Sequence, residues 1–153
     1  MDTSHEVILV IPGVPVGKPR MTKRDKWMNP PRPPVQRYRD WCDTVRESIK
    51  EQEVVIPEAA SIQHINWTAY FPPCERVQDG RTKSGKIRYR KTTLAEKGAM
   101  LGEMYRRKPD IDNIAKCWDC LFDEDEAIAF CTLRKEYSQS PRTEVRITYD
   151  ESI

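Results

Sequence analysis

Seven of the twelve prolines lie between residues 12 and 34, and this density excludes regular helix from that stretch. The apolar residues 7–11 come directly before Pro12 and predict a short buried strand. The residues between Pro12 and Pro34 are rich in Lys and Arg. They are therefore predicted to form an extended basic loop that leads into the first helix.

Beyond the prolines, the apolar residues follow two different periods. They recur at helical spacing over residues 34–52, which predicts an amphipathic helix, and they alternate with polar residues over 61–71, which predicts a half-buried strand. Near the end of the chain, patterns typical of a helix over 112–122 and of strands over 127–135 and 143–149 follow one another.

Residues 74–107 carry Asp79-Gly80, Ser84-Gly85 and a basic run, which predicts a hairpin or flap outside the core, with a short helix at 94–101. The element order is therefore β-α-β-flap-α-β-β. This order predicts an α+β fold, a small mixed β-sheet with helices packed on it, and residues 1–153 are expected to form one domain.

Composition narrows the class of protein. No apolar run reaches the roughly 18 residues of a membrane span, and the N-terminus lacks the pattern of a signal peptide, so a cytoplasmic protein without a membrane partner is expected. The five cysteines are odd in number and irregularly spaced, which favours free thiols. Two histidines and the absence of a phosphate-binding glycine loop argue against histidine-based hydrolysis and nucleotide hydrolysis.

The net charge of +2 hides a strong segregation of charge. Residues 12–39 hold eight Lys and Arg against one acid, residues 75–108 hold eleven against four, and residues 109–130 hold seven acids against one lysine. Two basic segments around an acidic block are typical of a polyanion-binding protein with a cation site. The residues predicted to contact this polyanion are Lys18, Arg20, Lys23, Arg24, Lys26, Arg88, Arg90 and Lys91 and, outside the two segments, Lys135.

The acidic block opens with Asp110-Ile111-Asp112-Asn113-Ile114-Ala115-Lys116. Asp112 is predicted to cap the helix, and at about 100° per residue Asp112, Lys116, Asp119 and Asp123 fall on one stripe of its surface. Carboxylates in such a cluster suit Mg²⁺, which takes one or two of them and completes its shell with water. A simpler interpretation is a helix cap with an exposed Asp–Lys pair. Beside two basic segments, Asp110, Asp112 and Lys116 together favour a metal-dependent phosphodiester site.

This segment resembles the RusA-type Holliday-junction resolvases, whose hallmark is D-x-D-N-x-x-K at a helix start, followed by an acidic pair and a strand. Here the motif is Asp110 to Lys116, and the acidic pair is Glu124-Asp125. The Pro12 to Arg20 segment and Lys135 also fit the family. The resemblance implies a RusA-like, homodimeric, bacterial or phage-encoded endonuclease that depends on Mg²⁺, with Mn²⁺ able to substitute. Its substrate would be branched DNA, four-way junctions above all.

The resemblance implies that Asp110, Asp112 and Asp125 bind the metal and that Lys116 assists catalysis. The turn after the helix is shorter here than in the family, which leaves Asp123 as the alternative third ligand. If the helix runs to Phe122, Asp123 lies about 16 Å along its axis from Asp112, too far for one ion, so Asp125 is preferred. Two other functions stay open, a non-catalytic nucleic-acid-binding module and an adaptor that presents its proline-rich segment.

Overall fold

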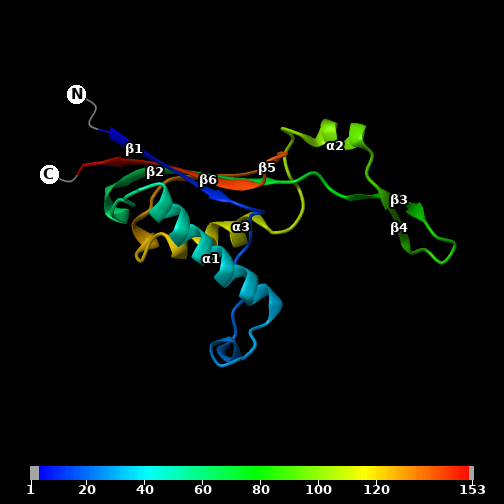
Figure 1. Ribbon diagram of the computed structural model, residues 1–153, viewed down its shortest axis with the longest axis horizontal. Helices are drawn as coiled ribbons and strands as arrows, with labels where there is room; N and C mark the ends of the chain where they lie inside the picture. Colours follow the sequence, from blue (N-terminus) through cyan, green and yellow to red (C-terminus); the bar gives the residue numbers. More distant parts are fainter. Residues whose placement is uncertain (1–3, 152–153) are drawn as a thin grey trace.

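A four-stranded sheet forms the centre of the computed structural model, which describes residues 4–151 (Figure 1). Its strands are β1 (Ser4–Pro12), β2 (Ile62–Phe71), β5 (Cys131–Tyr137) and β6 (Arg142–Asp150), in the order β1-β6-β2-β5. The central strand β6 is antiparallel to both β1 and β2, and the edge strand β5 is parallel to β2. The sheet is therefore mixed, as predicted.

One face of the sheet carries the core. The alternation in β2 buries Ile65, Trp67, Ala69 and Phe71 on that face, which confirms the predicted half-buried strand. Helix α1 (Pro33–Glu51) begins with two prolines. Proline has no backbone N–H, and the first turn of a helix tolerates this because the N–H groups there have no partner within the helix. The helix packs on the sheet with the ring centroid of Trp41 6.3 Å from that of Trp67.

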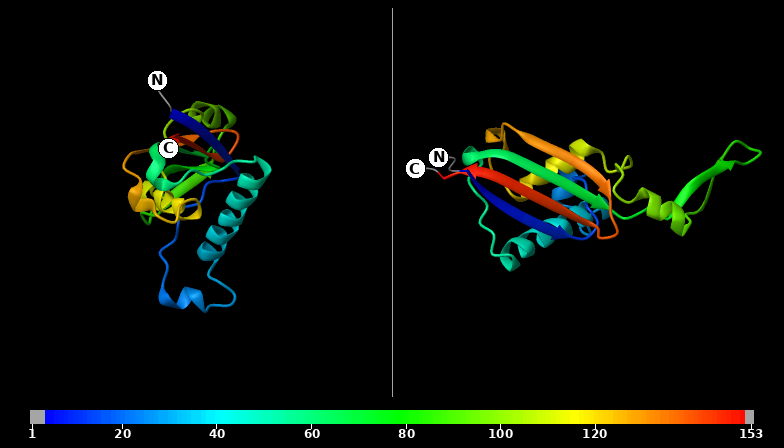
Figure 2. Two further views of the ribbon diagram at one scale, coloured as in Figure 1. Left: turned by 90° about the vertical axis from the view of Figure 1, so that its left-hand side faces the viewer. Right: turned by 90° about the horizontal axis from the view of Figure 1, so that it is seen from above.

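Helices α1 and α3 (Ile111–Ala115) lie on the same side of the sheet, and no helix covers the opposite face within the described residues (Figure 2). The predicted flap is a separate two-stranded sheet of β3 (Arg76–Arg81) and β4 (Ile87–Lys91), followed by α2 (Leu94–Met100). The hairpin projects well away from the main sheet (Figures 1 and 2). The predicted hairpin and short helix are thus confirmed.

The predicted helix over 112–122 is wrong in length. Helix α3 ends at Ala115, and the 3₁₀ turn η3 (Lys116–Cys120) replaces the rest. Two contacts hold this stretch against the basic segment between Pro12 and Pro34, which we call the proline-rich loop. The Cys117 thiol donates to the Val16 carbonyl at 3.2 Å, and Asp119 forms an ion pair with Lys18. Both partners lie 101 residues earlier in the chain, so the local pattern carries no sign of them.

The predicted start of the penultimate strand at Ala127 is also wrong. A 3₁₀ turn, η4 (Asp125–Ala127), occupies that place, and β5 begins at Cys131. Two backbone hydrogen bonds close the turn, from the Ala127 N–H to the Glu124 carbonyl and from the Ile128 N–H to the Asp125 carbonyl. The acidic residues therefore precede the strand and stay on the surface, where their charges are solvated.

The expectation that all five cysteines are free is wrong for one pair. Cys42 on α1 and Cys120 in η3 form a disulfide across 78 residues, a pairing that only the fold brings together. Cys117 is a buried free thiol, and burial raises its pKa to about 12. Among residues 4–151, no helix is long and apolar enough to cross a membrane.

Candidate active site

Asp110 and Asp112 stand at the start of α3. The Asp110 carbonyl accepts the first backbone bonds of the helix, from Asn113 at 3.1 Å and Ile114 at 3.2 Å. Asp110, not Asp112, is therefore the N-cap residue, which corrects the prediction, and its carboxylate makes no capping bond. Buried Ile114 anchors the helix in the core, whereas both carboxylates are exposed. They are free to bind a ligand.

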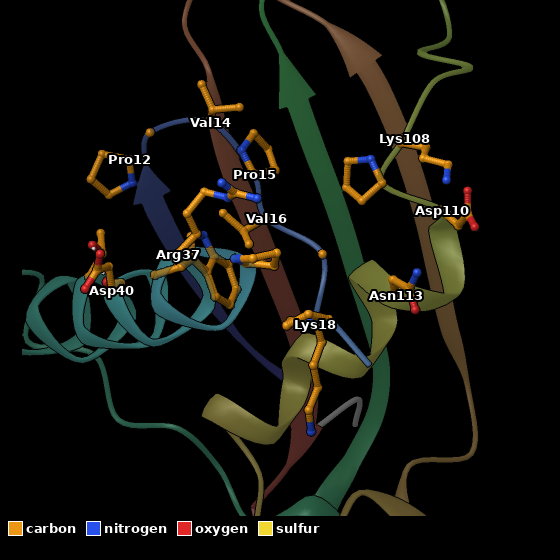
Figure 3. A pocket seen from close by; sticks show the side chains of 17 residues that line it. Pro12, Val14, Pro15, Val16, Lys18, Arg37, Asp40, Lys108, Asp110 and Asn113 are labelled. Atoms are coloured by element: carbon orange, nitrogen blue, oxygen red, sulfur yellow. Dashed lines mark hydrogen bonds between the residues drawn. The ribbon is translucent and has the colours of Figure 1, made fainter. Parts of the chain in front are cut away.

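Both carboxylates line one shallow cavity of about 690 Å³. The other residues around it are mostly cationic or aromatic: Tyr105, Arg106, Arg107, Lys108, Ile111 and Lys135. Asp110 also borders a second, larger cavity of about 910 Å³, whose lining includes Lys18, Arg37 and Lys108 (Figure 3). The carboxylate pair can bind a cation, and the basic side chains on both sides of it can bind an anion at the same time.

Three consecutive carbonyls lead up to Asp110, and each accepts a hydrogen bond. The Lys135 ammonium donates to the Arg107 carbonyl at 2.7 Å and to the Pro109 carbonyl at 2.8 Å. The Tyr105 hydroxyl donates to the Lys108 carbonyl at 3.0 Å. Desolvation lowers the pKa of Lys135, and the nearby charge of Asp110 opposes that shift. We call these three bonds the carbonyl clamp, and they fix Asp110 against β5.

Tyr105 is itself held in place, since its ring stacks on Phe71 with centroids 4.0 Å apart and its N–H donates to the Lys135 carbonyl at 2.9 Å. Tyr105 was not among the residues predicted from the sequence. A single aromatic in a polar segment belongs to no periodic pattern, so its contact with β5 leaves no local signal.

The proline-rich loop packs against the other side of the site. The Lys18 N–H donates to the Asn113 carbonyl at 2.9 Å, and the backbone at Gly17 passes directly over Pro109. A Cβ atom at position 17 would lie 2.5 Å from the Pro109 Cβ and 3.3 Å from the Asn113 Cβ. Glycine is therefore required here for a close approach of two segments.

Gly17→Ala is expected to lower the melting temperature by roughly 3–10 °C, because overpacking of this kind costs about 1–3 kcal/mol. Gly98→Ala is the matched control. Gly98 lies inside α2 with no atom near its absent Cβ, so alanine there adds about 0.5–1 kcal/mol of stability. Thermal unfolding of both variants measures the difference. Equal melting temperatures would contradict the close packing at Gly17.

Comparison with known protein families gives one match. The family model for the endodeoxyribonuclease RusA matches residues 12–148 of the 153-residue chain. The chain belongs to the RusA family. The match spans the proline-rich loop, the carboxylate pair and β5, which together form the site described above. A search of curated proteins finds no match.

RusA-family members are endodeoxyribonucleases, and two exposed carboxylates fit the oxygen-rich site that a hard divalent cation requires. Asp112 does have a neighbouring cation, because Lys116 Nζ lies 3.7 Å from its Oδ2, the i,i+4 spacing predicted from the sequence. Both side chains are largely exposed, 59% for Lys116 and 68% for Asp112, so this ion pair is weak and yields to a ligand.

The third carboxylate of the RusA-type pattern is not assembled with the other two. Neither Asp123 nor Asp125 lines the cavity of Asp110 and Asp112. Within the described residues, no three acidic, His or Cys side chains lie close enough to hold one metal ion. Because α3 ends at Ala115, no continuous helix separates Asp123 from Asp112, and the 16 Å distance expected along such a helix does not exclude Asp123. The preference for Asp125 stays a prediction.

Eight of the nine predicted DNA contacts occupy two places in the RusA fold, and the ninth, Lys135, lies on β5. Lys18, Arg20, Lys23, Arg24 and Lys26 lie on the proline-rich loop and its 3₁₀ turn η1 (Lys23–Lys26), and Arg88, Arg90 and Lys91 lie on β4. Asp25 organises the loop. Its buried carboxylate accepts bonds from the Arg32 guanidinium at 2.8 and 3.0 Å and from the Thr22 N–H at 2.6 Å. These bonds keep its pKa far below the usual range.

Asp25→Asn is expected to lower the melting temperature at pH 7, because the ion pair with Arg32 is lost. A depressed carboxyl pKa stabilises the fold above the ordinary value near 3.9, and that stability is lost as the pH falls toward the depressed pKa. The gap between wild type and variant should therefore narrow steadily as the pH falls below about 4. Melting curves from pH 7 to pH 2.5 test this, and a gap that stays constant over that range would contradict it.

Proposed function

We propose that this chain is a divalent-metal-dependent endonuclease that cuts branched DNA, with four-way junctions as its preferred substrate. The observation that carries the proposal is the pair Asp110 and Asp112 in one open cavity with Arg106, Arg107 and Lys135. The RusA family match supports the choice of DNA. An exposed, shallow site suits a bulky polymer better than a small molecule, which binds in deeper pockets.

Asp110 and Asp112 would hold Mg²⁺, or Mn²⁺ in its place, and we propose Asp125 as the third ligand. Such an ion neutralises negative charge on a phosphodiester under attack and orients water. Lys116, whose ammonium lies 3.7 Å from the Asp112 carboxylate, would add a second positive charge for the phosphate oxygens. The carbonyl clamp of Lys135 and Tyr105 holds Asp110 in place before DNA arrives.

The basic residues of the proline-rich loop would contact the phosphates that flank the cut. Lys18 lines the larger cavity next to Asp110, which supports a path for the DNA strand along this loop. Each chain has one carboxylate pair, whereas resolution of a four-way junction requires two symmetric cuts. A homodimer with twofold symmetry would supply both, and we propose that assembly.

A cleavage assay on a labelled four-way junction, with Mg²⁺ and with EDTA, tests the proposal. Paired nicks at symmetric positions are expected with Mg²⁺ alone, and a linear duplex of the same sequence should stay intact. Binding without cleavage at any Mg²⁺ or Mn²⁺ concentration would support the alternative, a non-catalytic nucleic-acid-binding module. Cleavage of the linear duplex at an equal rate would refute the preference for junctions.

Lys135→Met should lower the cleavage rate at saturating DNA by up to about 100-fold, because loss of the clamp lets Asp110 shift. Junction affinity should change little, since the ammonium already has two carbonyl partners. Single-turnover rates and filter binding separate the two effects. A loss of affinity with an unchanged rate would make Lys135 a DNA contact, as the sequence alone predicted, and not a positioning residue.

A further inference from the structure

The β3–β4 hairpin has no share in the core. Every residue of β4 is exposed, and in β3 only Val77 is partly covered. Neither strand joins the main sheet, and the hairpin extends away from it (Figures 1 and 2). Two-stranded ribbons without a hydrophobic face are marginally stable. Contact with a partner would therefore increase the stability of a ribbon of this kind.

The charge of the hairpin identifies the chemistry of that partner. Among the described residues, six cations of the hairpin form no ion pair with an acid: Arg76, Arg81, Lys83, Lys86, Arg88 and Lys91. Asp79 is the one acidic residue between Arg76 and Lys91. Unpaired like charges on a narrow ribbon repel one another, and a polyanion relieves that repulsion.

The base of the hairpin is fixed, whereas its far end is free. Arg90 donates two bonds to Glu96 of α2, at 2.6 and 2.9 Å, and Lys97 donates to Glu75 at 3.0 Å. The pairing with Arg90 and the cap at Thr93 lower the pKa of Glu96 to about 2. Arg90 is therefore a structural anchor, and the cations nearer the turn are left for a ligand.

We propose that the β3–β4 hairpin is a DNA-gripping arm that lies in the major groove of one duplex arm of the substrate, away from Asp110 and Asp112. The major groove is about 12 Å wide and admits a two-stranded ribbon. At about 3.3 Å per residue, the hairpin extends roughly 23 Å from Arg76 to Lys83, about two thirds of a duplex turn. This inference rests on the proposed function for its substrate.

The test compares the wild type with K83Q/K86Q/R88Q. Each lost phosphate contact lowers the slope of log K against log salt by about 0.9, so the triple variant should lose about 2.7. Between 50 and 200 mM salt this difference amounts to about 40-fold in affinity. The matched control is R46Q/K50Q/R146Q, which removes three cations from α1 and β6 and should keep the wild-type slope.

Dimethyl sulfate methylates guanine N7, which faces the major groove, so it reports the position of the arm. Wild type should protect guanines in one duplex arm several base pairs from the branch, and the triple variant should not. Identical protection and salt slope would overturn the proposal, as would a variant whose change is confined to the oligomeric state, since the hairpin would then bind a second copy.

These measurements distinguish failure of the proposed hairpin contact from failure of the proposed nuclease activity. A wild type that binds junctions and protects those guanines without cutting would refute the nuclease and leave the arm supported. A wild type that cuts junctions without any such protection would support the nuclease and refute the arm. A wild type that binds no DNA would refute both.

Discussion

Asp112→Asn is expected to reduce junction cleavage by more than tenfold while junction binding persists or tightens. The substitution removes one metal ligand, and it also removes a negative charge that repels the phosphates. Cleavage rates and binding constants, measured on the same junction in Mg²⁺ and in Ca²⁺ respectively, show both effects.

Asp43→Asn is the matched control for this variant. Asp43 is an exposed aspartate on α1 whose carboxylate pairs with Arg46 at 2.7 Å, and it lines neither of the two cavities that Asp110 borders, so its loss removes the same charge outside the site. Cleavage by this control should stay near the wild-type rate. If Asp112→Asn keeps more than a tenth of that rate, its cost is below the roughly 1.4 kcal/mol of a tenfold effect and Asp112 is not catalytic.

Asp125→Asn should abolish most cleavage in Mg²⁺ and recover in part at high Mn²⁺, whereas Asp123→Asn stays near wild type. The reason is that a weakened site needs more metal or a metal of higher affinity to fill. Both aspartates are exposed in the segment between η3 and β5, so either variant should fold. Metal titrations of the two variants, run side by side, give the comparison.

Two results would contradict this assignment. The reverse pattern, with activity lost at Asp123, would make Asp123, two residues before η4, the third ligand. Full activity in both variants would show that Asp110 and Asp112 suffice, with water in the remaining positions of the metal ion.

The parts of this fold that follow a repeating pattern could be predicted from the sequence. The period of α1 and the alternation of β2 arise because each buries one face against the other, so their side chains record the packing directly. The hairpin was recognisable from its Gly-containing turns, Asp79-Gly80 and Ser84-Gly85, and from its basic run. Asp110, Asp112 and Lys116 were recognisable as a cluster because their spacing is local.

What could not be predicted depends on contacts between distant segments. The end of α3 depends on Lys18 and Val16, and the disulfide joins Cys42 to Cys120. The role of Lys135 as a clamp is visible only when β5 lies beside the segment that precedes Asp110. In each case the chain brings together groups that no window of neighbouring residues contains.

The segment between α2 and Asp110 follows the outer edge of β5. Backbone bonds join Gly102 to Tyr137, Tyr137 to Glu103 and Tyr105 to Lys135, so the segment covers an edge that would otherwise offer unpaired groups to another chain. Because the same stretch carries the clamp residue Tyr105, release of this edge and release of Asp110 are one local unfolding event. Amide hydrogens at Tyr105 and Tyr137 should therefore exchange with solvent at similar rates, and a bound substrate should slow both together.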